Sequence, residues 1–275
     1  MNSVAQALAT ARALGLDRLD AQLLLSDALA RPRSWLLAHG EHPIDPALAL
    51  RFEAHCARRA DGEPVAYLLG EKEFHGLRLK VDRAVLVPRP DTETLVDWAL
   101  ELLAAAPARP AVADLGTGSG AIALALAHAR PHARVCAVDV SLAALAVARA
   151  NGRQLGLDVE WLHSDWWSAL AGRRFDMVVS NPPYIAADDP HLPALRHEPG
   201  LALTPGGDGL DALRTLIACA PAHLRPQGWL LVEHGHDQAE AVRELLKRWG
   251  FTATTSRNDL AGRPRCSAGQ RSPHP

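Results

Sequence analysis

Long apolar segments are missing from this 275-residue sequence. No uncharged apolar stretch approaches the ~20 residues that a membrane-spanning helix needs. The start, Met1-Asn2-Ser3-Val4, lacks the basic segment that opens a secretory signal peptide. We therefore expect a cytoplasmic protein that does not associate with membranes.

Clustered metal ligands are also scarce. His234-Gly235-His236 has a spacing found in metal sites, but only Glu233 stands nearby as a further ligand, and we expect no bound metal. Because the cysteines form no C-x-x-C pair, reduced structural thiols are expected rather than a zinc knuckle or a redox dithiol. The four cysteines are Cys56, Cys136, Cys219 and Cys266.

Charge of one sign is not in excess. The chain has 29 Lys and Arg against 31 Asp and Glu, for a formal net charge of −2, and the two signs also balance within the first ninety residues. A nucleic-acid-binding surface usually needs clustered basic residues. The charge therefore gives no reason to expect a polyanion as a partner, while 48% hydrophobic residues suffice for one large domain and a small one.

Residues 1–72 carry repeated signals for helix starts and stops. Asp45-Pro46 has the pattern of an N-cap followed by proline in the first turn, and Gly70 is a typical helix end. We predict a small domain of about five helices. The period then changes to strand-like alternation, which predicts a β-hairpin linker over residues 73–88 with its second strand at 84–87.

From residue 89 to residue 275, strands and helices alternate. Asp91 or Thr92 is expected to cap the first of these helices. The alternation predicts an α/β domain with a mostly parallel sheet, covered by helices on both faces. The strands are expected at 111–115, 134–138, 159–163, 175–180 and 229–233, and the helices at 121–129, 141–155, 210–220 and 238–249.

A glycine-rich loop connects the first of these strands to its helix. Glycines let a backbone approach a ligand closely, and the helix N-terminus favours a negative group. Asp139 ends the next strand, where a carboxylate can accept hydrogen bonds from two ribose hydroxyls. The pattern predicts an adenosine cofactor but leaves nicotinamide and S-adenosylmethionine (SAM) both open. The loop consists of Gly116, Thr117, Gly118, Ser119 and Gly120.

A second motif, Asn181-Pro182-Pro183-Tyr184, follows the apolar run 175–180. The two prolines fix two φ angles, so the turn is stiff. The Asn181 side-chain oxygen and the Pro182 carbonyl can accept both hydrogens of a flat NH2 group, and Tyr184 can lie against its face. The motif resembles the [N/D]-P-P-[Y/F] motif of methyltransferases that use SAM on planar nitrogens, which favours SAM over nicotinamide.

Between these motifs lies Ser164-Asp165-Trp166, just after the third strand. Asp165 can accept a hydrogen bond from an adenine amino group. Trp166 can cover the adenine ring by an aromatic contact worth about a kcal/mol. A tryptophan buried in the core is the equally weighted alternative.

With these residues in place, the chain resembles the release factor glutamine methyltransferases over nearly its whole length. Several ordered motifs carry the resemblance together, which makes it more specific than any one of them. They are Glu73-Phe74-His75-Gly76, Val87-Pro88-Arg89-Pro90-Asp91-Thr92-Glu93, the loop 114–120, Ser164-Asp165-Trp166, Asn181-Pro182-Pro183-Tyr184, Glu198-Pro199, Gly207-Asp208-Gly209-Leu210 and Glu233-His234-Gly235.

The resemblance implies a helical domain that engages the release factor, a hairpin linker, and a Rossmann-like methyltransferase domain with a seven-stranded, mostly parallel sheet over residues 89–275. It implies methylation of the side-chain nitrogen N5 of the glutamine in the Gly-Gly-Gln motif of class I peptide chain release factors, with S-adenosyl-L-homocysteine as the second product. Residues 116–120, Asp139, Trp166 and Asn181 would then bind SAM, and residues 181–184 the glutamine.

Three alternatives are weighed against this function. An adenine N6 methyltransferase acting on nucleic acid presents the same flat amine to the same motif, but the balanced charge argues against a nucleic-acid substrate. A nicotinamide oxidoreductase rests on the glycines alone. The third alternative is a non-catalytic binding module with a SAM fold. We further expect a monomer, and a loop over residues 185–210 that closes over the substrate.

Overall fold

The computed structural model describes residues 3–273 and divides the chain into two compact units, with the boundary between Glu71 and Lys72. The first unit contains five α-helices among its described residues, as predicted. Asp45 caps the fourth of them by accepting a hydrogen bond from the backbone of Ala47, at 2.8 Å. The helices are α1 (Val4–Ala13), α2 (Arg18–Leu29), α3 (Arg33–Ala38), α4 (Pro46–Ala60) and α5 (Val65–Leu69).

The second unit is built on a seven-stranded sheet with the order β5-β4-β3-β6-β7-β9-β8. Neighbouring strands from β5 to β7 are parallel, and β9 is antiparallel to both of its neighbours. The predicted mostly parallel sheet is thereby confirmed. Its strands are β3 (Ala111–Leu115), β4 (Arg134–Asp139), β5 (Glu160–His163), β6 (Phe175–Ser180), β7 (Leu224–Glu233), β8 (Phe251–Asn258) and β9 (Pro264–Arg271).

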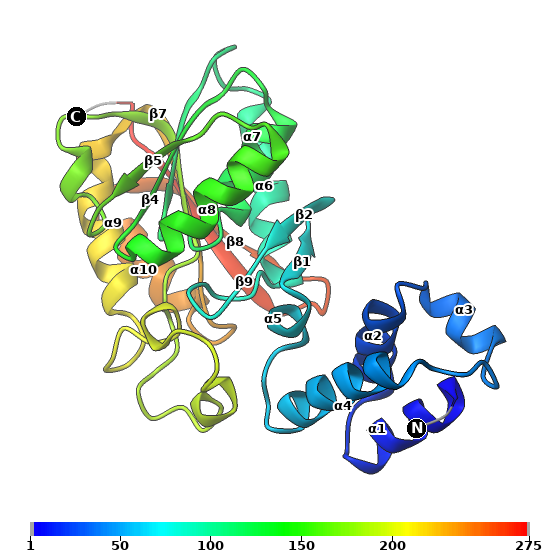
Figure 1. Cartoon of the computed structure of the whole chain (residues 1–275). Coiled ribbons are helices and arrows are strands. Elements are labelled where there is room, and N and C mark those ends of the chain that lie inside the picture. Colours follow the sequence, from blue (N-terminus) through cyan, green and yellow to red (C-terminus); the bar gives the residue numbers. More distant parts are fainter. Residues whose placement is uncertain (1–2, 274–275) are drawn as a thin grey trace. The chain divides into compact units, whose positions relative to one another are not determined.

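Helices cover both faces of this sheet (Figure 1). Successive residues of a strand point to opposite faces, and β3 shows the consequence. Val112 belongs to the apolar cluster with α6 and α7, while Ala111 and Ala113 belong to the cluster with α9 and α10. A strand buried on both faces is mostly apolar, and Asp114 near the end of β3 is the exception in this strand. The helices are α6 (Glu93–Leu103), α7 (Ala121–Ala129), α8 (Leu142–Leu155), α9 (Asp211–His223) and α10 (Ala239–Arg248).

The β-hairpin forms earlier in the chain than expected. Its strands, β1 (Glu71–Phe74) and β2 (Leu77–Lys80), are joined by His75 and Gly76, whose φ angles are 50° and 78°. Two positive φ angles are what a tight two-residue hairpin turn requires. The predicted second strand at 84–87 is wrong, because these residues form a turn and an irregular segment. Apolar side chains of β2 pack in the same cluster as α6 and α7.

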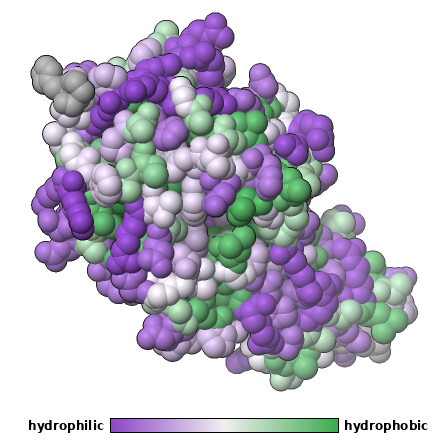
Figure 2. All heavy atoms as spheres, turned by 90° about the vertical axis from the view of Figure 1, so that its left-hand side faces the viewer, coloured by the Kyte–Doolittle hydropathy of each residue, from purple (hydrophilic) through white to green (hydrophobic). Residues whose placement is uncertain are grey.

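The surface mixes polar and apolar character. On the face shown in Figure 2, hydrophilic residues are interspersed with small hydrophobic clusters. Within residues 3–273, no helix combines the length and the apolar composition needed to cross a membrane. Leu201 is one of the large apolar side chains left exposed, at 66%, and it lines the cavity described next.

Candidate active site

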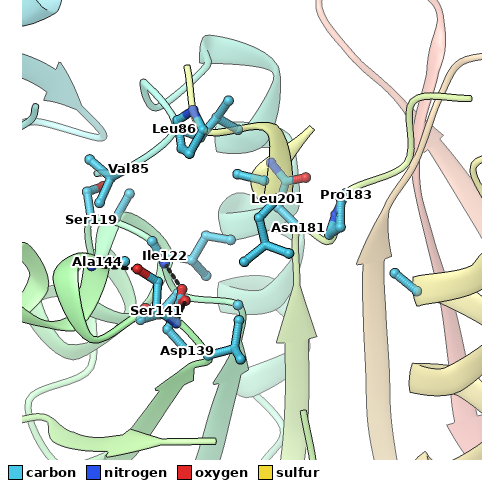
Figure 3. A pocket seen from close by; sticks show the side chains of 18 of the residues that line it. Val85, Leu86, Ser119, Ile122, Asp139, Ser141, Ala144, Asn181, Pro183 and Leu201 are labelled. Carbon is cyan, nitrogen blue, oxygen red and sulfur yellow. Dashed lines mark hydrogen bonds between the residues drawn. The ribbon is translucent and has the colours of Figure 1, made fainter. Parts of the chain in front are cut away.

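The segments that follow β3, β4 and β6 meet at a cavity of about 550 Å³. Since β3 lies between β4 and β6 in the sheet, the carboxyl ends of these three parallel strands are neighbours. The chain order reverses between β3 and β6, and α/β sheets bind ligands at such a point. In Figure 3, Asn181 and Pro183 lie on one side of the cavity, with Asp139 and Ser141 on the other.

The glycine-rich loop after β3 forms part of the cavity wall. Gly118 has a φ of 56°, and within residues 3–273 no atom lies closer than 4 Å to the position that a Cβ would take. The backbone N–H of Gly118 donates a hydrogen bond to Asp139 Oδ2, at 2.8 Å. The loop therefore exposes backbone that a ligand can approach closely. Gly116, Thr117, Gly118 and Ser119 all line the cavity, as predicted for a binding loop.

Gly120 serves a different purpose from the other residues of the loop. It is the N-cap residue of α7, with a φ of 85°. A Cβ at this position would lie 3.0 Å from Trp161 and 3.1 Å from Leu124. The residues that line the cavity do not include Gly120. Close packing thus accounts for this glycine, and its predicted contact with a cofactor is not supported.

Asp139, the last residue of β4, presents its carboxylate at the cavity. Its Oδ2 accepts from the N–H of Gly118 and its Oδ1 from the N–H of Ser141, both at 2.8 Å. Each carboxylate oxygen can accept a second hydrogen bond. Burial raises the pKa of Asp139, and the backbone hydrogen bonds oppose that shift. The carboxylate is therefore oriented by the backbone and can still accept hydrogen bonds from two hydroxyl groups.

Asp114 stabilises the glycine-rich loop by hydrogen bonds. Its Oδ2 accepts hydrogen bonds from the Thr117 hydroxyl at 2.6 Å and from the backbone N–H of Ala123 at 3.2 Å. Its Oδ1 has no hydrogen-bond partner among the described residues. Burial raises the pKa of Asp114 to about 7. The sequence marked Asp114 only as the start of the loop, whereas the structure gives it a supporting role.

The segment after β5 brings both of its predicted residues, Asp165 and Trp166, to the cavity wall. Trp166 has a φ of 46°, which is uncommon for a residue other than glycine. Ser164 stabilises this turn, since its hydroxyl donates to the Trp166 carbonyl at 2.9 Å and accepts from Ala169 at 3.0 Å. The indole ring is half-buried and packs over Gly116. Of the two alternatives for Trp166, the position in the cavity wall is the one observed.

Asn181 follows β6 directly and lines the cavity. Its side-chain Nδ2 donates a hydrogen bond to Thr92 Oγ1, at 3.1 Å. Within the described chain the amide oxygen Oδ1 has no such partner and is left to accept from a ligand.

The prediction that Asp91 or Thr92 caps α6 is wrong, because neither side chain makes a capping bond to the backbone of α6.

The rest of this motif differs in part from expectation. Pro183 lines the cavity, while Pro182 is buried and does not belong to the lining residues. Tyr184 is also absent from the residues lining the cavity. Its hydroxyl donates a hydrogen bond to Glu233 Oε1 at 3.1 Å, and burial raises the pKa of the phenol. The role of Tyr184 as a wall against a flat substrate group is therefore not supported.

Another part of the cavity wall comes from two further segments, of which the sequence assigned only the loop 185–210 to the site. One is the irregular stretch after the hairpin, with Val85 and Leu86. The other belongs to the loop 185–210, with Leu201 and Thr204. Both segments carry motifs of the family resemblance, which was the available signal. Apolar residues in irregular segments do not reveal by themselves whether they line a cavity or fill a core.

The histidines at the end of β7 do not form a metal centre. The ring of His234 is buried, with Nε2 2.8 Å from Ser267 Oγ and Nδ1 2.8 Å from the Gly235 carbonyl. In the part of the chain that the structure describes, no three side chains of His, Cys, Asp or Glu are grouped so that they can hold a metal ion.

Comparison with known proteins yields matches over both units. The PrmC N-terminal domain family matches residues 1–70, and the methyltransferase small domain family matches residues 93–208. Release factor glutamine methyltransferases of Xylella fastidiosa (strain 9a5c) and Burkholderia pseudomallei (strain K96243) are 52% and 50% identical, covering 96% and 98% of this chain and 97% and 99% of those proteins. A methyltransferase structure from Pyrococcus furiosus shares the fold, with a TM-score of 0.54 at 16% identity over 72% of this chain and 90% of that one.

Proposed function

The chain belongs to the release factor glutamine methyltransferases, and we propose that it methylates N5 of the glutamine in the Gly-Gly-Gln motif of class I peptide chain release factors, with SAM as the methyl donor. The single observation that carries the proposal is the cavity with Asn181 on one side and Asp139 on the other. The proposal includes a cytoplasmic monomer that takes no nucleic acid as substrate, and a helical unit that engages the release factor.

The residues at the cavity fit an adenosine-bearing methyl donor. Asp139 would accept hydrogen bonds from the two ribose hydroxyls, since each of its oxygens can still accept one. Trp166 would lie against the adenine ring. The open backbone at Gly118 leaves room for the charged methionine end. Bound in this way, SAM supplies an electrophilic methyl group on its sulfur.

The protein has to make an unreactive nitrogen attack that methyl group. An amide nitrogen is a poor nucleophile because its lone pair is delocalised into the carbonyl. Asn181 Oδ1 would accept one N–H hydrogen, aim the lone pair, and stabilise the positive charge that develops. The motif assigns the second hydrogen to the Pro182 carbonyl, although Pro182 is not among the residues that line the cavity. Held in this way, the nitrogen would form its bond to the methyl carbon as the C–S bond breaks, and the electron pair would stay on the sulfur. Water accepts the amide proton, so no strong general base is needed.

Methyl transfer to three purified substrates tests the proposal. Labelled SAM is supplied with a class I release factor, with DNA and with RNA, and the label is expected only in the glutamine of the release factor. Label found only in nucleic acid would refute the proposal. Asn181→Ala is expected to lower kcat about 10²-fold or more while its thermal unfolding midpoint stays unchanged, because it removes a group that acts on developing charge.

A further inference from the structure

Glu233 is a buried carboxylate directly behind the Asn181 motif. It ends β7, whose Val232 is paired in parallel with Ser180 of β6, so Glu233 and Asn181 occupy neighbouring positions just past that pair. The residue is 1% exposed and is not among those that line the cavity. Burying a carboxylate is costly unless it is hydrogen-bonded. The groups that bond to Glu233 therefore indicate what it does.

One hydroxyl group hydrogen-bonds to this carboxylate, whose buried Oε2 has no hydrogen-bond partner among the described residues. The Tyr184 hydroxyl donates to Oε1 at 3.1 Å. The Thr92 side chain, like the Tyr184 hydroxyl, favours the charged form of Glu233 and lowers its pKa. Arg265 adds a favourable positive charge, and Asp91 an unfavourable negative one. Thr92 is the link to the cavity, because its Oγ1 lies 3.1 Å from Asn181 Nδ2.

The direction of these hydrogen bonds follows from the chemistry of the groups. A carboxylate can only accept, so we assign the single hydroxyl proton of Thr92 to Glu233, whose buried Oε2 has no other donor among the described residues. The Thr92 oxygen is then left to accept, and only the NH2 end of the Asn181 amide can donate to it. A flipped amide would oppose two acceptor oxygens. In its charged form, Glu233 thus determines which end of Asn181 is available to a ligand.

We propose that Thr92 and Glu233 are positioning residues that hold the Asn181 amide with its oxygen available for the substrate nitrogen. The inference rests on the proposed function, in which Asn181 has to accept a hydrogen bond from an NH2 group. The position of Thr92 supports it: the residue directly precedes α6, where a threonine hydroxyl commonly caps the helix, yet it makes no capping bond to α6 and binds Asn181 instead.

Substitutions of Thr92 and Glu233 test the proposal. Thr92→Val removes the hydroxyl at nearly constant shape, and Glu233→Gln replaces a pure acceptor with a group that can also donate. Each is expected to lower kcat for release factor methylation about tenfold or more, with the dissociation constant for SAM unchanged. Thr92→Ser is expected to recover most of the lost rate. The double variant is expected to be no slower than Thr92→Val, because the residues act as one unit.

Thr252→Val is the matched control. It removes a hydroxyl that bonds to the Gln270 carbonyl at 3.2 Å on β8, at the edge of the sheet, and it is expected to keep the wild-type rate. A wild-type rate in Thr92→Val, or fully additive losses in the double variant, would overturn the proposal. If Glu233→Gln does not fold, the comparison of Thr92→Val with Thr92→Ser decides alone. A wild-type protein that leaves release factor unmethylated speaks against the proposed function, and the same series then decides this inference on whichever substrate is methylated.

Discussion

The carboxylate of Glu198 accepts a hydrogen bond from the backbone N–H of Val87, with 3.0 Å between Oε2 and N, and it also pairs with Arg89. Val87 and Glu198 are 111 residues apart in the chain. Glu198 is buried, so this contact is shielded from water. It joins the loop 185–210 to the segment after the hairpin, and both contribute to the cavity wall. One side chain therefore holds two parts of the wall together.

Removing this contact is expected to loosen the loop. Glu198→Ala leaves the buried Val87 N–H without its partner, which costs about 1–3 kcal/mol. We expect faster proteolysis within residues 185–210 and a value of kcat/KM for release factor about tenfold lower. Limited proteolysis followed by mass spectrometry locates the cleavage. Glu240→Ala, which removes an exposed acid on α10, is the control, and equal cleavage rates in both variants would contradict the expectation.

Two glycines of the same loop are expected to respond differently to alanine. Gly120→Ala pushes a Cβ against Trp161 and forces a positive φ on alanine, so it should lower the free energy of unfolding by roughly 2–4 kcal/mol. Gly118→Ala meets open space and carries only the backbone cost, about 1–2 kcal/mol. Its Cβ would enter the binding region, so affinity for SAM should fall about tenfold in calorimetry. Equal stability of the two variants would show that the packing at Gly120 is not tight.

Tyr184→Phe tests whether Tyr184 stabilises the fold or contacts the substrate. The phenyl ring keeps the packing but loses the hydrogen bond to Glu233, which should lower the free energy of unfolding by about 1–3 kcal/mol in urea titrations. Affinity for SAM should be retained. A variant with wild-type stability and a raised KM for release factor would instead identify Tyr184 as a contact for the substrate.

Asp114 makes stability depend on pH. Burial raises its pKa to about 7 in the fold, above the ordinary value of 3.8, and nearby Asp139 adds to the shift. Between these two pH values the folded state binds more protons than the unfolded state, so stability is highest at low pH and falls as pH rises through about 7. Asp114→Asn is expected to remove roughly 1–3 kcal/mol of the loss between about pH 5 and pH 8 in urea titrations. Some pH dependence should remain in the variant, because burial raises the pKa of the Glu233 carboxyl to about 7 as well. Identical pH profiles for wild type and variant would contradict the assignment to Asp114.

Thiol labelling is expected to modify a single cysteine of the folded protein. Cys219 is exposed, whereas Cys56, Cys136 and Cys266 are buried. Burial raises the pKa of Cys56 to about 11 and that of the other two buried thiols to about 12, so little thiolate is present near neutral pH. One equivalent of thiol should react in buffer and four in denaturant, and Cys219→Ser should react only in denaturant. Rapid modification of a second thiol would show that a core cysteine is accessible.

Features that depend on residues close together in the chain were predictable from the sequence. The alternation of strands and helices follows from short-range patterns of apolar residues, and the sheet confirms it. The glycine-rich loop, Asp139 and Asn181 lie at strand ends in the sequence, and parallel strands bring such ends to one edge. Their meeting at one cavity therefore required only the strand order. The hairpin turn at His75 and Gly76 was missed because the apolar residues 84–87 were taken for the second strand, whereas they form a turn and an irregular segment.

By itself, the sequence determined the class of fold and the residues placed at the carboxyl edge of the sheet, because both depend on local patterns. Only the tertiary structure decided how the polar side chains are paired. It made Thr92 Oγ1 the acceptor of a hydrogen bond from Asn181 rather than a cap of α6, and it paired the Tyr184 hydroxyl with Glu233 outside the cavity lining. Such pairs join residues far apart in the chain, and a polar group bonds to whichever partner the packing of strands and helices brings within about 3 Å.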